Sequence, residues 1–130
     1  MIVVGYSADR HGAAALDHGI AEAKLRDTNL LVINATTGEA LSDPRFAQSD
    51  EVHDVQDRLT ECGVEFELAQ PVGTDPADEL LKAMENDDAQ LLVVGIRHRS
   101  PVGKLLFGSV AQKVLLECPK PVLAVKPDEL

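Results

Sequence analysis

The stretch from Gly95 to Ser109 combines glycines, basic residues and a hydroxyl in a pattern that could hold a phosphate chain. It follows an apolar run at 91–94 and precedes an apolar pattern with helical spacing, which predicts a strand, a long loop and a helix start. Gly108 and Ser109 would then lie at the first amides of that helix, where free N–H groups and the helix dipole favour an anion. We therefore expect this loop to wrap phosphates.

Basic residues within the loop add positive charge that suits a phosphate. Arg97 and Arg99 could each offer paired donors to one phosphate, and His98 could donate as well. Between residues 97 and 126, six basic residues and one acidic residue give a net charge of +5, which leaves −15 for the rest of a chain whose net charge is −10. A local positive field in an acidic protein favours a small anion and argues against nucleic acid or an anionic membrane as a partner.

The same residues have alternatives that involve no ligand. Gly95 and Gly108 could serve only a tight strand exit and close helix packing. Ser109 could be the N-cap of the helix, a role that is compatible with donation to a phosphate. The arginines of the loop could form a solvated face, and His98 could be either a ligand contact or an exposed loop residue.

Five short apolar runs predict strands, and four amphipathic segments between them predict helices. We expect the strands at 2–4, 30–33, 64–68, 91–94 and 122–125, and the helices at about 13–26, 52–62, 77–84 and 109–118. Strict alternation at 64–68 predicts a strand at an edge of the sheet, with one face open to water. Gly63 would end the second helix in the left-handed conformation, and Asp75 with Pro76 would start the third.

This alternation of strands and helices predicts an α/β fold with a parallel sheet and helices on both faces. In such sheets ligands bind outside the carboxyl ends of the strands, where the strand order reverses. The loops after the first, second and fourth strands would meet there, which places Ser7, Asp9, Ala35 and the 95–109 loop around one crevice. The segment 39–49 has weak patterning and a Ser-Asp-Pro break, so we expect a mobile connection.

Length and composition favour one globular domain over residues 1–130, because 45% of the residues are apolar. No uninterrupted apolar run in the sequence approaches the length of a membrane span. The amino-terminal residues lack the pattern of a secretory signal, so we expect a cytoplasmic protein. Cys62 and Cys118 match no metal-ligand or redox spacing, and both fall on apolar helix faces. We expect them to be buried thiols.

The loop resembles the nucleotide-binding members of the universal stress protein family, which carry Gly-x2-Gly-x9-Gly-Ser/Thr after the fourth strand. Gly95, His98, Gly108 and Ser109 stand at the four positions of that pattern. The resemblance extends to the element order, the chain length and the ending at 121–126. It implies a flavodoxin-like or Rossmann-like three-layer sandwich whose five parallel strands have the order 3-2-1-4-5. It also implies ATP or AMP as the ligand, with or without Mg²⁺.

The resemblance further implies which residues hold the nucleotide. The loop amides and the hydroxyl of Ser109 would bind the phosphates, with Val94 and Val110 flanking the loop, and the backbone at Ala35 would meet the adenine. Two positions depart from the family pattern. His98 replaces the second glycine and could either crowd the backbone or donate to a phosphate. Ser7 stands at the usual aspartate, and Asp9 stands at the usual serine.

The sequence favours a regulatory role over catalysis. It contains no Gly-x-Ser-x-Gly elbow, no His-Glu-x-x-His and no Walker pattern, and Asp9 is the only acid that we place near the crevice. Family resemblance also implies a homodimer formed by pairing of the apolar edge strand Val122–Val125. Two alternatives remain: a nucleotide-free dimeric interaction module in the stress response, and a slow ATP hydrolase.

Overall fold

The computed structural model describes residues 1–38, 43–96 and 108–127, and these form nine helices and strands. The strands are β1 (Ile2–Gly5), β2 (Leu30–Ile33), β3 (Phe66–Ala69), β4 (Leu91–Gly95) and β5 (Val122–Val125). The helices are α1 (Arg10–Leu25), α2 (Ser49–Cys62), α3 (Pro76–Met84) and α4 (Ser109–Glu117). The predicted alternation of strands and helices is thereby confirmed.

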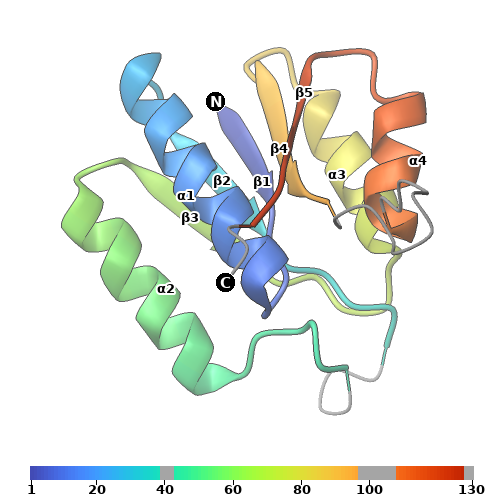
Figure 1. Cartoon of the computed structure of the whole chain (residues 1–130), viewed down its shortest axis with the longest axis horizontal. Coiled ribbons are helices and arrows are strands. Elements are labelled where there is room, and N and C mark those ends of the chain that lie inside the picture. The colour runs from blue at the N-terminus through green and yellow to red at the C-terminus, as the bar shows by residue number, and fades with distance from the viewer. Residues whose placement is uncertain (39–42, 97–107, 128–130) are drawn as a thin grey trace.

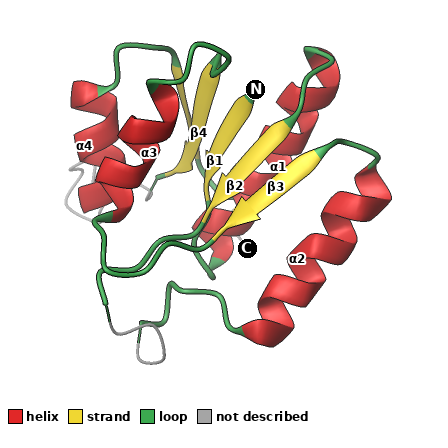
Figure 2. Ribbon diagram, turned by 180° about the vertical axis from the view of Figure 1, so that it is seen from behind, coloured by secondary structure: helices red, strands yellow, loops and turns green. Residues whose placement is uncertain are grey.

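The five strands form one parallel sheet with the order β3-β2-β1-β4-β5. Helices α1 and α2 cover one face and α3 and α4 cover the other, so the protein has three layers (Figures 1 and 2). The chain moves outward from β1 through β2 to β3, then returns to β4 on the other side of β1. The strand order therefore reverses between β1 and β4, as the sequence predicts.

Alternating side chains of the central strands enter two separate cores. Ile2 and Val4 of β1 face the layer of α1 and α2, whereas Val3 faces the layer of α3 and α4, and all three are fully buried. An all-apolar strand is favoured here because both of its faces are covered by helices. The two cores hold the ends of the central strands in place.

Local signals fix several element ends where the sequence predicts them. Gly63 ends α2 with φ of 78°, a left-handed conformation that glycine adopts without steric cost. The carboxylate of Asp75 accepts a hydrogen bond of 2.8 Å from the Ala77 amide, and Pro76 is the first residue of α3. The edge position of β3 is also confirmed, although the strand begins at Phe66, which pairs with Leu30, rather than at Val64.

Two predictions about local structure are wrong. Cys62 and Cys118 are half-buried rather than buried, because each lies at the carboxyl end of its helix, where the helix no longer packs along its full face. Residues 43–48 are not a loose connection: the Ala47 amide donates to the buried side chain of Asn34 at 2.7 Å, and the Phe46 amide donates to the Asp43 carbonyl at 3.1 Å. Residues 39–42 lie outside the described part of the chain.

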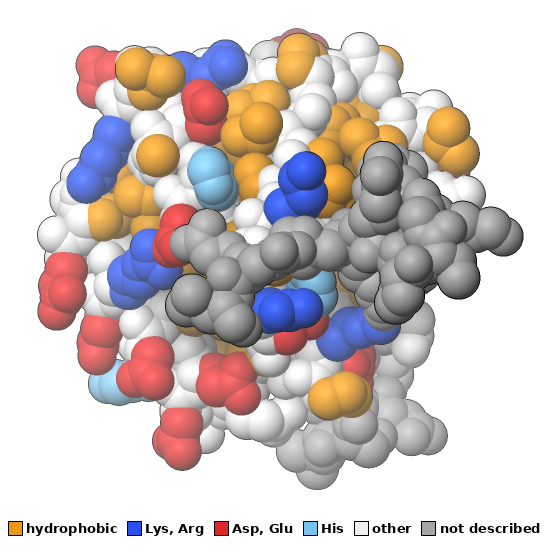
Figure 3. Space-filling view, in the orientation of Figure 1, with side chains coloured by type: hydrophobic (Ala, Val, Ile, Leu, Met, Phe, Trp, Pro, Cys, Tyr) orange, Lys and Arg blue, Asp and Glu red, His pale blue; other side chains and the backbone are white. Residues whose placement is uncertain are grey.

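Charge is distributed unevenly over the surface. In Figure 3 acidic side chains gather over the region where α2 runs in Figure 1. That helix carries five acidic residues, Asp50, Glu51, Asp54, Asp57 and Glu61. The surface of α2 is therefore strongly negative. No described helix is long and apolar enough to cross a membrane.

Candidate functional site

A cavity of about 590 Å³ lies at the carboxyl ends of β1, β2 and β4, where the strand order reverses. Its walls come from the loop after β1, the end of β2, residues 43–45, and the amino ends of α3 and α4. Ile33, Leu80 and Val94 are among its apolar lining residues. Its volume falls in the range of pockets that hold small organic ligands, about 300–1,000 Å³.

The structure brings most of the predicted site residues together around this cavity. Those that line it are Ser7, Asp9, Ala35, Val94, Gly95, Gly108, Ser109 and Val110. They come from three loops that are far apart in the sequence, so the topology alone assembles them. The predicted phosphate contacts at Arg97, His98 and Arg99 lie outside the described residues.

The amino end of α4 forms one wall of the cavity. Gly108 is the N-cap residue, with φ of 85° and ψ of 153°, and as a glycine it has no side chain with which to cap the helix. The alternative that Ser109 is the N-cap is therefore wrong: Ser109 is the first helical residue, because the Gln112 amide already donates to the Gly108 carbonyl at 3.0 Å. Ser109, Val110 and Ala111 all line the cavity, so the first amides of α4, which have no partner within the helix, belong to its wall.

Gly95 satisfies a packing requirement that needs no ligand. A Cβ atom at this position would lie 2.4 Å from the carbonyl oxygen of His11, in the first turn of α1. No larger residue fits without moving the backbone of α1 or β4. The alternative of close packing is therefore sufficient to explain this glycine, whereas Gly108 is explained by its positive φ.

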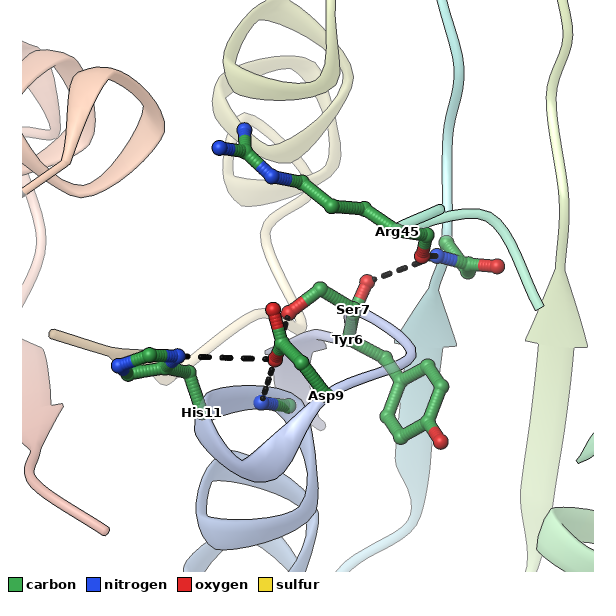
Figure 4. A network of polar contacts seen from close by, with 7 residues as sticks. Tyr6, Ser7, Asp9, His11 and Arg45 are labelled. Atoms are coloured by element: carbon green, nitrogen blue, oxygen red, sulfur yellow. Dashed lines mark hydrogen bonds and ion pairs between the residues drawn. The ribbon is translucent and has the colours of Figure 1, made fainter. Parts of the chain in front are cut away.

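Asp9 is tied to the start of α1 rather than free in the cavity. Its Oδ1 accepts hydrogen bonds from the Gly12 amide at 2.9 Å and from the Ser7 hydroxyl at 2.7 Å, and it lies 3.8 Å from Nδ1 of His11 (Figure 4). Partial burial opposes ionisation, but these hydrogen bonds and the neighbouring His11 outweigh it, so the pKa of Asp9 is lowered from its ordinary value. Asp9 is thus an anionic N-cap at neutral pH, and Ser7 is its partner.

The polar residues near β1 do not form a nucleophilic site. The Ser7 hydroxyl donates to Asp9, so no hydrogen bond joins it to His11 as a general base would require. Among the described residues there is no group of three or more His, Cys, Asp or Glu side chains that could hold a metal ion.

Sequence reasoning missed the residue that organises one side of the cavity. The Asn34 side chain is 2% exposed and makes four hydrogen bonds. Its Nδ2 donates to the carbonyls of Tyr6 at 2.9 Å and Arg45 at 3.0 Å, while its Oδ1 accepts from the Ala47 amide at 2.7 Å and from Gln70 Nε2 at 3.0 Å. The only sequence feature that marks Asn34 is its place directly after the apolar run of β2. The composition of residues 34–38 predicts no more than a turn.

Four further lining residues with acidic or basic side chains escaped the sequence analysis: His11, Asp43, Arg45 and Asp75. His11 lies within α1, where its spacing gives no metal pattern. Asp43 and Arg45 lie in the segment predicted to be mobile, and Asp75 is recognisable only as a helix cap. None has a local pattern that points to a ligand, because the fold rather than the sequence spacing brings them to the cavity.

The reversal of strand order and the cavity beside it define an α/β protein with a cavity at its switch point, where proteins of this class bind ligands. The chain belongs to the universal stress protein family, whose model matches residues 1–126. A universal stress protein of Mycolicibacterium smegmatis is 70% identical over 127 residues, which are 98% of both chains.

Solved structures of other members agree with the observed fold. A universal stress protein of Archaeoglobus fulgidus has 32% identity and a TM-score of 0.77, covering 96% of this chain and 97% of its own. A structure from the same organism in complex with dAMP has 28% identity and a TM-score of 0.64, covering 96% of each chain. The three-layer fold with strand order 3-2-1-4-5 and the family membership predicted from sequence are thereby confirmed.

Proposed function

We propose that this protein binds an adenine nucleotide, ATP or AMP, in the cavity at the carboxyl ends of β1, β2 and β4. The observation that carries the proposal is that one cavity is lined both by the amino end of α4, whose N-cap is a glycine, and by apolar side chains of the sheet and α3. Such a cavity offers an anion site and an apolar surface within reach of one ligand. The dAMP complex of the related Archaeoglobus fulgidus protein supports the choice of an adenine nucleotide.

In this proposal the two ends of the nucleotide occupy different walls. The phosphates lie against the amides of Gly108, Ser109 and Val110, helped by the loop between Gly95 and Ser109. The base lies towards the end of β2, against the backbone of Ala35. The strand order supports this arrangement, since β1 separates β2 from β4 and neighbouring strands are about 4.8 Å apart.

We further propose that binding is regulatory rather than catalytic and takes place in the cytoplasm. Asp9 is the residue that a hydrolytic role would need as a base, but its lowered pKa makes it a weak one at neutral pH. Its Oδ1 is also held by the Gly12 amide and Ser7. Any Mg²⁺ that accompanies ATP would be held mainly by phosphate oxygens and water, as this ion usually is.

Titration calorimetry with ATP and with AMP tests the nucleotide proposal directly. We expect saturable heat with at least one of them. We also expect a higher unfolding temperature in its presence, because a ligand at 100 times its dissociation constant stabilises the native state by about 2.7 kcal/mol. Absence of both heat and thermal shift at millimolar nucleotide would contradict the proposal and favour the nucleotide-free alternative.

The edge strand β5 supports a homodimer as part of this function. Val122, Leu123 and Ala124 are only half-buried at the open edge of the sheet. Lys120 could have shielded this edge, but its ammonium donates to the carbonyls of Asn86 at 2.7 Å and Ala89 at 2.9 Å, at the end of α3. An uncovered apolar edge is a surface for pairing with another strand.

Sedimentation equilibrium tests the dimer. At micromolar concentration we expect a species of twice the 14.0 kDa of one chain. If dimerisation uses strand pairing alone, added nucleotide should leave the dimer unchanged, because β5 lies outside the cavity lining. A species of single-chain mass across the concentration range would refute the dimer without affecting the nucleotide proposal.

A further inference from the structure

The described wall of the cavity carries more negative than positive charge. Its carboxylates are Asp9, Asp43 and Asp75, and Arg45 is the only Arg or Lys among the described lining residues. Each carboxylate already accepts hydrogen bonds from its own neighbourhood: Asp43 from the Thr36 hydroxyl at 2.8 Å, and Asp75 from the Ala77 amide at 2.8 Å. These anions repel a phosphate, so a bound phosphate needs a nearby cation.

The backbone of Arg45 is held in place by three hydrogen bonds. Its carbonyl accepts from Asn34 Nδ2 at 3.0 Å and from the Ala8 amide at 2.9 Å. Its amide donates to Asp43 Oδ1 at 3.0 Å. The segment that carries this arginine is therefore fixed to the ends of β1 and β2 before any ligand arrives.

The guanidinium of Arg45, in contrast, has no hydrogen bond or ion pair with any residue that the structure describes. Figure 4 shows its side chain extending over Ser7, away from the end of β2 and towards the side of the view where α4 lies. Within the described part of the chain, none of its five N–H donors is engaged, and their planar arrangement matches phosphate oxygens.

We propose that Arg45 binds the phosphate of the nucleotide from the side opposite the amino end of α4. This assignment rests on the proposed nucleotide site and adds a specificity determinant to it. Arg45 makes the cavity select a phosphorylated nucleoside over the free nucleoside, because only the phosphorylated ligand brings an anion that the guanidinium can bind. That contact also offsets the repulsion between the phosphate and the carboxylates. The residue comes from the connection between β2 and α2, not from the glycine-containing loop.

Calorimetry with AMP and with adenosine, on the wild-type chain and on Arg45→Gln, tests this role. We expect Arg45→Gln to weaken AMP binding at least about 10-fold, the loss for one charge-assisted contact, and to leave adenosine binding unchanged. Arg10→Gln is the matched control, since Arg10 is an exposed arginine close to the site in sequence that does not line the cavity. It makes the same change in net charge and should bind both ligands like the wild type.

The possible results separate this assignment from the function on which it rests. Equal losses for AMP and adenosine in Arg45→Gln would mean that the arginine contacts the base or sugar, which overturns the phosphate assignment. An AMP affinity equal to the wild type, or an equal loss in Arg10→Gln, would also overturn it while leaving the nucleotide site intact. A wild-type chain that binds neither AMP nor adenosine would remove the proposed function itself. Arg45 is exposed, so the variant should fold normally.

Discussion

Gly108→Val is expected to reduce nucleotide affinity by more than about 100-fold while leaving the fold intact. Gly108 has φ of 85°, a conformation that a β-branched residue adopts only at a cost of about 1–3 kcal/mol. The chain can relieve this strain only by rotating the backbone where α4 begins, and that rotation would redirect the amides of Ser109 and Val110. A valine side chain would also enter the wall of the cavity.

Titration calorimetry with AMP or ATP measures this loss, and circular dichroism checks the fold. Gly63→Val is the matched control, because Gly63 has φ of 78° at the end of α2 with open space around it and does not line the cavity. The control should lose stability from the same kind of strain and keep its nucleotide affinity. Wild-type affinity in Gly108→Val would mean that the phosphates bind elsewhere.

Asn34→Ala is expected to lower the free energy of unfolding by about 3 kcal/mol, a large effect for one exchange of a polar residue. The substitution removes four hydrogen bonds at a site that is 2% exposed. The Ala47 amide, which belongs to a residue only 4% exposed, would lose its acceptor. A buried donor left without a partner destabilises the native state by more than its hydrogen bond contributed to the free energy of unfolding, because the donor is also cut off from water.

Chemical denaturation followed by circular dichroism measures the change in unfolding free energy. Asn29→Ala provides the control, since Asn29 is an exposed asparagine five positions earlier and its side chain makes only a long contact with Thr28. We expect that variant to stay within about 0.5 kcal/mol of the wild type. A similarly small change in Asn34→Ala would show that the four hydrogen bonds do not hold the segment 43–47.

The architecture could be predicted from the sequence because its main signals are local. Apolar runs such as that of β4 are typical of strands covered on both faces, and Gly63 and Asp75 are standard residues at helix ends. The crossover connections between parallel strands are almost always right-handed, which leaves few possible strand orders. In these orders the loops of the predicted site lie together at the carboxyl ends of the strands. The exact start of β3 was less accessible, because the register of Phe66 with Leu30 rather than local alternation determines it.

The wall formed by residues 43–48 could not be predicted for a physical reason. Much of its order comes from the buried side-chain amide of Asn34, which bonds to Arg45 and Ala47, 11 and 13 positions away in sequence. Polar composition and a proline look the same in a segment fixed by such a contact and in a free loop. Arg45 was overlooked as a consequence, since a basic residue in an apparently mobile segment gives no sign that it faces a cavity.

The close approach of Gly95 to the His11 carbonyl gives Gly95 a different role from Gly108, although both belong to one motif. Because packing between β4 and α1 requires Gly95 whether or not a ligand binds, relatives should keep this glycine even after losing nucleotide binding. The positive φ of Gly108 makes its replacement cost backbone strain of about 1–3 kcal/mol, which the fold can bear. A family member with glycine at the position of Gly95 and a bulky residue at the position of Gly108 is therefore expected to keep the fold and to have lost nucleotide binding.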